Sequence, residues 1–533
     1  MMSKKLLAVL LVIVMCVPSA SVAYRAFDGD DSTSIGMTDV TDNGNENVVK
    51  TTVNQPVSTQ SFGVLSDEPQ GEFVEGAVLI KDDSFDESKL NGIEYDNCSP
   101  LFPNSVWYRI ELSDGVDTKE TVKALNDSGL FQKVDYDYVM GADGEIESID
   151  VSSNPNASEQ TYLDTMCIRD GWGYLANNSV SPGGNPSVVV AVIDTGVDYN
   201  HIDLRNNIWV NTAEIPDNGI DDDGNGYVDD YRGWNFVANT NDPMDDNGHG
   251  THVAGIVAAE NNTVGTVGVA WNCKVMVLKA GNSSGYFTNS SIAAAVQYAY
   301  MNGASVINMS FGGTSISMAV EDALENAYVQ CVLVAAAGNN GYCNQPGCPH
   351  HIPFVEVVYP AALTYVVGVM SCNAYGAVSS FSNYDHNPYN SIEYDVFACG
   401  ESVVSTWINN RVAKMSGTSM AAPVISGIAA LLRAQNPDRD VYSNKYIQSQ
   451  ITNTGTILPM GPYAFANAHD ALTKVPSPYV KMYDYYCFDD SNYSDMNNAD
   501  RIIDAGERIH LAIELRNRGG IRNKCNCNNR CIS

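Results

Sequence analysis

Four short apolar runs alternate with segments of helical periodicity in the middle of the chain. The runs lie at residues 187–193, 273–280, 304–310 and 331–338. Because consecutive rather than alternate residues are apolar, the runs indicate strands buried on both faces, as in a parallel sheet covered by helices. Helices are predicted between or after them at residues 250–260, 290–301, 318–327 and 420–434. For residues 154–475 we therefore predict an α/β domain with a doubly wound, mostly parallel sheet, whose chemistry lies at the carboxyl ends of its strands.

A smaller unit is predicted ahead of this domain, at residues 73–140. The stretches GAVLI, VWYRIEL and QKVDYDYVM have the composition of strands, and KETVKALNDSG that of a helix. They predict a small α+β unit. Residues 24–72 are polar and poor in large apolar side chains, which predicts a flexible spacer, and the polar residues 141–153 are predicted to be a linker.

The last segment, residues 476–533, is predicted to be a short tail with β character. Its stretch NNADRIIDAGERIHLAIELRNRGG is similar to the opening of a β-sandwich accessory domain. The segment shows too few strands for a complete sandwich. A truncated accessory domain and a small tail held by disulfides both remain open.

The N-terminus has the pattern of a secretory signal, residues 1–23. Lys4 and Lys5 precede an apolar run at 6–17, and small residues end at Ala23, where we expect cleavage. A membrane anchor is the alternative, but the run is short for a bilayer span, and no later segment is apolar enough. We therefore expect a secreted, extracellular protein.

The number of cysteines agrees with secretion through an oxidising environment. Of the 13 cysteines, Cys16 lies in the expected signal, so 12 enter an environment in which pairing is expected. Cys343 and Cys348 bracket a turn in CNQPGC and are the first candidate pair. The sequence leaves the other partners open.

The net charge of the chain limits the classes of partner that it can bind. Its 533 residues include 29 Lys and Arg against 63 Asp and Glu, a formal net charge of −34. Such a surface repels phosphate backbones and anionic membranes, so we expect no nucleic-acid partner. Acidity also suits divalent cations, although most acidic proteins are simply well solvated.

Three side chains at predicted strand or helix ends are candidates for chemistry. Asp194 follows the first buried strand, His249 starts a helix, and Ser419 precedes another, in KMSGTSMAAPVISG. Each has an ordinary structural alternative: a strand-end cap or calcium ligand, a structural histidine, and a helix N-cap. His249 and His252 are three residues apart but lack the further ligands of a zinc site. Together, Asp194, His249 and Ser419 favour catalysis.

Several segments resemble those of the subtilisin-like serine peptidases. They are AVIDTGVDYNHIDL, NGHGTHVAGIVA, INMSFGG, VAAAGNNG, YPAA and SGTSMAAPVISGIAALL, within residues 187–432. The order Asp, His, Ser is that of subtilisin itself and belongs to the resemblance. The resemblance implies a serine endopeptidase in which Ser419 is the nucleophile, His249 the general base and Asp194 the residue that orients the imidazole.

The resemblance also implies an oxyanion site and a peptide-binding surface. Asn339 and the N–H of Ser419 would stabilise the oxyanion, although an asparagine beside a glycine is otherwise a common turn residue. Polypeptide substrates would add as a strand and place an apolar side chain before the cut. No acid commits the enzyme to Lys or Arg at that position. The matching residues are Ser283, Ser284, Gly285, Ser310, Phe311, Gly312, Ala336, Ala337 and Gly338.

By the same resemblance, residues 73–140 would be an inhibitory propeptide that is cut off by the enzyme itself, leaving a monomeric mature enzyme that starts between residues 141 and 161. The alternative is an independent binding module. The position directly ahead of the catalytic domain favours the propeptide.

Two regions suggest structural calcium, which prefers oxygen ligands. The first resembles the tight calcium site of the family: Asp203, Glu260, Asn262, Val264 and Thr266. The second is an Asp-rich loop whose candidate ligands are Asp217, Asp221, Asp223, Asn225 and Asp229. Arg232 stands where an EF-hand has its glutamate, so the loop is not an EF-hand, and an acidic surface turn is the alternative.

Two other functions are weighed against a peptidase. A catalytically silent binding protein of the same fold would have lost Asp194, His249, Ser419 or Asn339, and all four are present. A serine esterase of the α/β-hydrolase type would carry its nucleophile in G-x-S-x-G, whereas Ser419 lies in GTSMA.

Overall fold

The computed structural model describes residues 69, 71–142, 144–150, 159–341, 357–384, 394–457, 464–474, 480–489 and 509–517. The expected signal, nearly all of the spacer, and the candidate pair Cys343 and Cys348 lie outside these residues.

The largest sheet has nine strands in the order β16-β17-β13-β12-β11-β10-β6-β8-β7. Neighbouring strands are parallel except for the edge pair β16 and β17. The bounds are β6 Val189–Asp194, β7 Gly233–Asn235, β8 Lys274–Lys279, β10 Val306–Met309, β11 Val332–Ala336, β12 Val367–Cys372, β13 Val396–Cys399, β16 Thr456–Ile457 and β17 Ala464–Phe465. The four apolar runs of the sequence form β6, β8, β10 and β11 at the centre of this sheet, which confirms the predicted parallel core.

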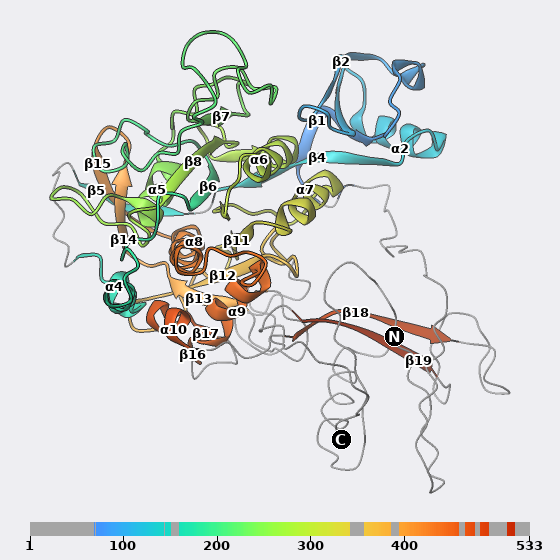
Figure 1. Cartoon of the computed structure of the whole chain (residues 1–533). Helices are drawn as coiled ribbons and strands as arrows, with labels where there is room; N and C mark the ends of the chain where they lie inside the picture. The colour runs from blue at the N-terminus through green and yellow to red at the C-terminus, as the bar shows by residue number, and fades with distance from the viewer. Residues whose placement is uncertain are drawn as a thin grey trace, which may run out of the picture.

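Helices cover both faces of the sheet, as Figure 1 shows. On one face lie α5 (His249–Ala258) and α8 (Thr418–Gln435), and on the other α6 (Asn289–Met301) and α7 (Met318–Tyr328). These are the four predicted helices, so the doubly wound α/β class is confirmed. The remaining helices of this lobe are α3 Tyr162–Thr165, α4 Ile168–Asn177, α9 Asn444–Asn453 and α10 Ala468–Thr473. We call described residues 159–474 the large lobe.

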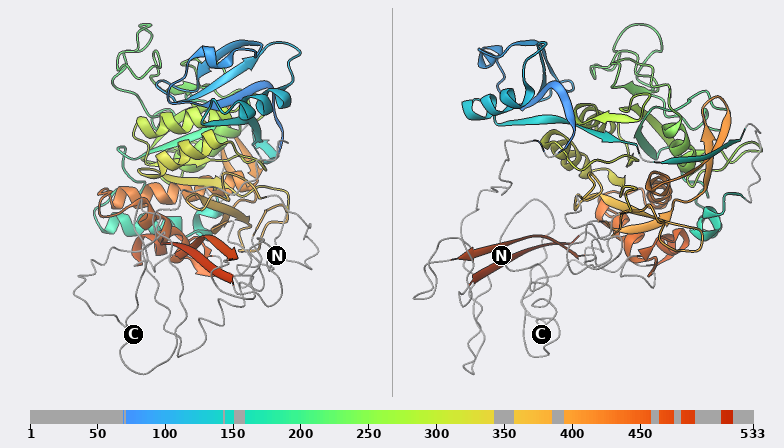
Figure 2. Two further views of the ribbon diagram at one scale, coloured as in Figure 1. Left: turned by 90° about the vertical axis from the view of Figure 1, so that its right-hand side faces the viewer. Right: turned by 180° about the vertical axis from the view of Figure 1, so that it is seen from behind.

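Residues 71–142 form a small lobe beside it (Figure 2). Its elements are β1 Phe73–Lys81, η1 Glu87–Leu90, β2 Tyr95–Pro100, β3 Trp107–Leu112, α2 Thr118–Ser128 and β4 Lys133–Gly141. Helix α2 packs on β1 and β4 and closes a separate core that includes Val78, Ile110 and Leu125. The predicted small α+β unit is therefore present.

Strand β4 connects the two lobes. It pairs with β1 in the small lobe, and its end pairs antiparallel with β9 (Tyr286–Thr288) of the large lobe. Two carboxylates of β4 also reach helix N-termini, where N–H groups lack helical partners. Asp137 accepts a hydrogen bond from Ser290 N at 2.8 Å, and Asp135 accepts one from Met318 N at 2.8 Å.

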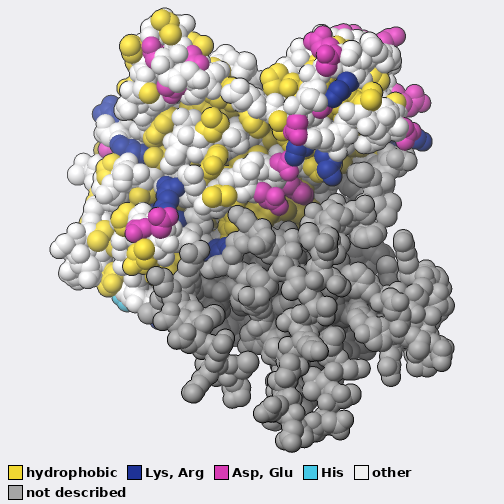
Figure 3. Space-filling view, turned by 45° about the vertical axis from the view of Figure 1, so that its right-hand side comes forward, with side chains coloured by type: hydrophobic (Ala, Val, Ile, Leu, Met, Phe, Trp, Pro, Cys, Tyr) yellow, Lys and Arg dark blue, Asp and Glu magenta, His cyan; other side chains and the backbone are white. Residues whose placement is uncertain are grey.

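An ion pair reinforces the contact between the lobes. Lys81 of the small lobe lies 2.7 Å from Asp322 on α7, which also accepts a hydrogen bond from Trp107 Nε1 at 2.9 Å. On the face drawn in Figure 3, acidic and basic side chains lie close together around the small lobe. The interface thus combines strand pairing, helix capping and charge.

Two smaller sheets complete the described structure. Strand β5 (Glu145–Asp150) pairs antiparallel with β15 (Arg411–Ser416), which pairs with β14 (Val403–Trp407). The stretch predicted as a linker therefore contains a strand. In the tail, β18 (Val480–Asp489) and β19 (Ile509–Asn517) form an antiparallel pair.

Two further expectations concern cysteines and membranes. Cys98, Cys167, Cys273, Cys331, Cys372 and Cys399 are thiols, so the expected pairing does not involve these described cysteines. Within the described ranges, none of the helices combines the length and the apolar character that a membrane span requires.

Buried His252 ties α5 to the β14–β15 hairpin. Its Nε2 lies 3.2 Å from the carbonyl oxygen of Val403 and 3.1 Å from that of Ala413, so a neutral imidazole donates to both strands. Burial lowers the pKa of His252 to about 3, with a further contribution from nearby His249. His252 therefore has a structural role in the folded protein.

This pKa predicts a loss of stability in acid. As the pH falls below about 6.5, the unfolded chain takes up a proton at His252 that the folded chain excludes, so the free energy of unfolding decreases by up to about 1.4 kcal/mol per pH unit. Urea unfolding of the Ser419→Ala protein at several pH values measures this slope. His252→Gln should flatten it, whereas His469→Gln, at a side chain 44% exposed, should not. Equal slopes in both variants would contradict the assignment.

Candidate active site

Asp194 and His249 form a buried carboxylate–imidazole pair. Asp194 is the last residue of β6 and His249 the first of α5. Asp194 Oδ1 lies 2.8 Å from His249 Nδ1 and also accepts a hydrogen bond from Thr195 N at 2.7 Å. Burial strengthens this contact because little water competes for it. With Nδ1–H donating to the carboxylate, Nε2 is left as the basic nitrogen.

A glycine allows the two residues to approach. A Cβ added at Gly250 would lie 2.1 Å from Gly196 O and 3.0 Å from Asp194 Cβ. Any side chain there would push the first turn of α5 away from β6. Gly250 N also donates to Thr195 Oγ1 at 3.0 Å, which ties the helix to the strand end.

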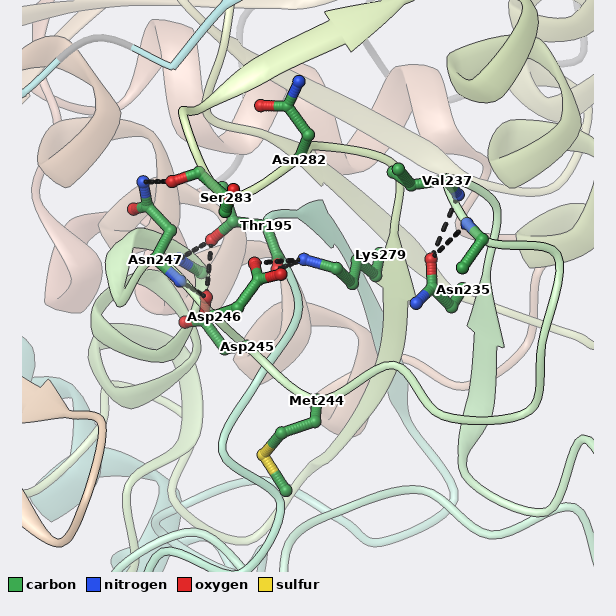
Figure 4. A network of polar contacts seen from close by, with 12 residues as sticks. Thr195, Asn235, Val237, Met244, Asp245, Asp246, Asn247, Lys279, Asn282 and Ser283 are labelled. Carbon is green, nitrogen blue, oxygen red and sulfur yellow. Dashed lines mark hydrogen bonds and ion pairs between the residues drawn. The ribbon is translucent and has the colours of Figure 1, made fainter.

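Asp245 organises the loop that leads into α5 (Figure 4). Its Oδ1 accepts hydrogen bonds from Thr195 Oγ1 at 2.9 Å, Asn247 N at 3.0 Å and Gly248 N at 2.9 Å. Its Oδ2 accepts from Thr251 N at 2.9 Å and Thr251 Oγ1 at 2.6 Å. Asp245 was not predicted from the sequence. The available signal was an acid shortly before a helix, which is typical of capping.

The same loop contacts two neighbouring segments. Lys279, at the end of β8, donates to Thr195 O and to Asp246 Oδ1, each at 2.6 Å. Asn247 Nδ2 donates to Ser283 O at 3.0 Å (Figure 4). The His249 loop is thereby fixed against the segment 283–285 that was predicted to bind peptide.

Ser419 is the second residue of α8, as its predicted place at a helix start requires. Its Oγ donates to Ser310 O at 3.0 Å, and Ser310 Oγ donates to Ser419 O at 2.9 Å. Pro423, four residues later, has no N–H to offer the Ser419 carbonyl, so Ser310 supplies the missing donor. Helices α5 and α8 pack together, which brings the two helix starts to the same edge of the sheet.

Asn339 is held next to Ser419 by Thr418. Its Oδ1 accepts hydrogen bonds from Thr418 N at 2.8 Å and Thr418 Oγ1 at 2.9 Å. Two donors on the oxygen identify the other atom of the amide as Nδ2, a donor directed away from Thr418. Thr418 was not predicted from the sequence, because no pattern relates a threonine to an asparagine 79 residues earlier.

The chain itself lies in the predicted peptide-binding surface. Gly141 and Gly312 exchange two backbone hydrogen bonds of 3.0 Å, and Ala142 N donates to Gly285 O at 2.8 Å. On the other side, Met140 pairs with Phe287. Residues 139–142 thus form a strand between the segments 285–288 and 310–312.

The other predicted binding residues make hydrogen bonds and ring contacts within the large lobe rather than with this strand. Phe311 is buried and stacks on Phe287 with ring centroids 4.5 Å apart. Ser284 N donates to Asn282 Oδ1 at 2.9 Å within its own turn. Ala336 ends β11, Ala337 N donates to Val369 O at 3.0 Å, and Gly338 N donates to Thr418 Oγ1 at 3.1 Å.

The residues of the first predicted cation site lie around Asp203, which is fully buried. Its carboxylate accepts from Thr266 N at 2.7 Å and Asn262 Nδ2 at 3.0 Å, and burial raises the pKa of Asp203 to about 7. Val264 N donates to Asn262 Oδ1 at 2.8 Å. The carboxylate of Glu260 instead accepts from Asn206, which leaves the Glu260 carbonyl facing the loop residue Asn262.

The Asp-rich loop brings together a somewhat different set of acids than predicted. Oxygen atoms of Glu214, Asp221 and Asp223 all lie within 4.8 Å of one another. Glu214 was not selected from the sequence, because it precedes the loop. Predicted Asn225 donates to Asp223 Oδ2 at 3.2 Å, and Asp229 accepts from Asn218 N at 3.0 Å. Asp217 is exposed and has a positive φ of 60°.

Comparisons with known proteins agree with this geometry. The sequence model of the subtilase family matches residues 185–502. The chain is 32% identical to the thermophilic serine proteinase of Bacillus sp. (strain AK1) over 76% of this chain and 89% of that protein. It is 36% identical to subtilisin DY of Bacillus licheniformis over 51% of this chain and 85% of that protein. It is 34% identical to subtilisin-like protease 1 of Plasmodium berghei (strain Anka) over 52% of this chain and 47% of that protein.

Asp245→Asn tests the loop that positions His249. The amide would turn its NH₂ group toward donors, so the free energy of unfolding should fall by about 2–4 kcal/mol. The His249 imidazole resonances should also shift in NMR spectra, because the start of α5 moves. Asp242→Asn is the control, since Asp242 accepts from Tyr199 and Met244 at the surface. A variant as stable as this control would contradict the role of Asp245.

Proposed function

The chain belongs to the subtilase family and is a serine-type endopeptidase, and we propose that it cuts polypeptides with Asp194, His249 and Ser419. The observation that carries this assignment is the buried 2.8 Å pair of Asp194 and His249 beside the start of α8. Asp194 keeps the proton of His249 on Nδ1, so that Nε2 can act as the base. A serine hydroxyl is too weak a nucleophile to react without such a base.

The reaction begins with rotation of the Ser419 hydroxyl from Ser310 O toward His249. His249 accepts the proton while Ser419 Oγ forms a bond to the carbonyl carbon of the substrate. His249 then returns the proton to the leaving amine as the C–N bond breaks. Water repeats these steps on the acyl-enzyme and releases Ser419.

Two donors would stabilise the negative oxygen of the tetrahedral intermediate. They are Nδ2 of Asn339 and the N–H of Ser419 in the first turn of α8. Thr418 holds the oxygen of Asn339, which keeps Nδ2 directed outward before the substrate arrives. Such preorganised donors stabilise the transition state because they need no rearrangement as charge develops.

We also propose that the chain is a secreted, monomeric precursor. Residues 1–23 would direct secretion, and residues 24–72 would be a spacer. Residues 73–140 would be an inhibitory propeptide that the enzyme removes itself. The strand at residues 139–142 supports the role of an inhibitory propeptide, because it pairs with Gly285 and Gly312, the backbone with which a polypeptide substrate would pair.

Calcium is proposed to stabilise the large lobe at two places. Asp203 offers a buried carboxylate beside Asn262 and the carbonyls of Glu260, Val264 and Thr266. Glu214, Asp221 and Asp223 offer converging oxygens in the acidic loop, with Asp217, Asn225 and Asp229 nearby. These all-oxygen sets suit Ca²⁺, which would offset the repulsion between the carboxylates.

Labelling with a fluorophosphonate probe tests the catalytic residues. The matured protein should take up label at Ser419, and Ser419→Ala should abolish both labelling and the appearance of a new N-terminus. Asn339→Ala should keep the label but lower kcat by about 10² to 10³, a magnitude known from subtilisin itself. Folded, mature protein that takes up no label would instead support a silent binding protein.

Removal of calcium should destabilise the large lobe. A chelator is expected to lower the Tm of the Ser419→Ala protein by about 5 °C or more, since a cation at 100 times its Kd contributes about 2.7 kcal/mol. Asp203→Asn and Glu214→Gln should each reduce the shift, and Asp440→Asn, at an exposed residue, should not. An unchanged Tm with chelator would argue against both sites.

A further inference from the structure

The strand at residues 139–142 defines how a polypeptide lies across the site. It is antiparallel to the segment that contains Gly312, and Gly141 pairs with Gly312. In a polypeptide bound in this register, the residue two positions after the one paired with Gly312 would lie opposite Ser310. Ser310 O is the atom that accepts the Ser419 hydroxyl at 3.0 Å. The register therefore directs the nucleophile to the peptide bond that follows this residue, whose counterpart in the chain's own sequence is position 143.

The next described residue agrees with this register. A Cβ added at Gly144 would lie 3.3 Å from Met415 Cε, 3.4 Å from Met420 Sδ and 3.7 Å from Ser416 O. Met420 directly follows Ser419, and Met415 and Ser416 end the strand that leads into α8. Gly144 thus lies beside the start of α8.

Val358 lies between the two backbone segments, 310–312 and 336–338, that would flank the substrate side chain before the cut bond. A Cβ added at Gly312 would be 2.3 Å from Val358 Cγ1, and one added at Gly338 would be 3.0 Å from Val358 Cγ2. Gly312 and Gly338 follow the neighbouring parallel strands β10 and β11. The two methyl groups therefore fill the space between the segments 310–312 and 336–338.

The position of Val358 is well fixed. Val358 is 5% exposed, and its N–H donates to Tyr394 Oη at 3.1 Å. The adjacent Tyr359 exchanges two backbone hydrogen bonds with Gly313, of 2.8 Å and 3.1 Å. A substrate side chain cannot displace Val358 without breaking these contacts.

We propose that Val358 is the residue that restricts this peptidase to short side chains before the cut bond. The proposal rests on the proposed function and specifies its substrates: polypeptides cut after residues such as Ala, Ser or Asp, rather than Phe, Leu or Lys. The sequence resemblance led us to expect an apolar side chain before the cut, whereas the proposal restricts that side chain by its length. The chain's own sequence fits, because position 143 is Asp, so the first bond cut is Asp143–Gly144.

Peptide substrates that differ only in the residue before the cut test the role of Val358 in the mature enzyme. The wild type should favour Ala over Phe in kcat/KM. Val358→Gly should raise kcat/KM for the Phe peptide by about 10- to 100-fold, since the freed space can bury a ring, and should change the Ala peptide by only a few-fold. Val358→Ala should give a smaller change in the same direction. Val332→Ala, at the opposite end of β11, is the matched control.

The precursor provides a second test. Mass spectrometry of the matured protein should find an N-terminus at Gly144. Asp143→Phe should slow this cut, and Val358→Gly in the same chain should restore it. An N-terminus produced by a cut elsewhere, or unchanged processing of Asp143→Phe, would overturn the proposal.

The two proposals fail in different ways. If no variant labels with fluorophosphonate or cuts any peptide, the catalytic assignment is wrong. If Ser419 labels and peptides are cut, but the Phe-to-Ala ratio is the same in wild type, Val358→Ala and Val358→Gly, only the role of Val358 is wrong.

Discussion

The carboxylate of Asp245 accepts hydrogen bonds from the end of β6, the following loop and the first turn of α5. Each of these donors would otherwise be buried without a partner, at a cost of about 1–3 kcal/mol. One side chain therefore fixes the distance between Asp194, which ends the strand, and His249, which starts the helix. Gly250 makes that distance short, and Lys279 fixes Asp246 beside it. The pair of Asp194 and His249 depends on this arrangement because the two residues lie on different elements, and Asp245 binds the segments next to both.

A second constraint arises where α8 begins. As the proposed nucleophile, Ser419 presents its hydroxyl and its N–H at a helix start, but Pro423 leaves the Ser419 carbonyl without the usual helical donor. Ser310 resolves this by donating to the carbonyl while its own carbonyl holds the Ser419 hydroxyl. The same short segment, 310–312, pairs with the strand at 139–142. Ser419 and the backbone that pairs with residues 139–142 are thus parts of one hydrogen-bonded unit.

The sequence predicted the features that depend on local pattern. The central strands β6, β8, β10 and β11 are continuous apolar runs, and the four large helices follow from periodicity. Asp194, His249 and Ser419 lie at the element ends predicted for them. Asp245 and Thr418 were not predicted because their roles depend on partners distant in sequence, and Glu214 because it precedes the acidic loop that it joins. Val358 was not predicted because a valine within VEVVYP carries no signal of the space that it fills. Strand β5 was read as a linker because its polar composition is typical of a loop, whereas the exposed edge of β15 supplies its partner.

Strand β4 pairs with strands of both lobes. It is the last strand of the small lobe, next to β1, and its end pairs with β9 of the large lobe. Its carboxylates Asp135 and Asp137 cap α7 and α6. If the chain is cut after this strand, as we propose, the cut removes none of these contacts, so hydrolysis of the bond and separation of the small lobe would be distinct events. The severed lobe would remain bound as a product that blocks the enzyme, and the onset of activity would be governed by the dissociation of an interface rather than by the speed of the chemistry.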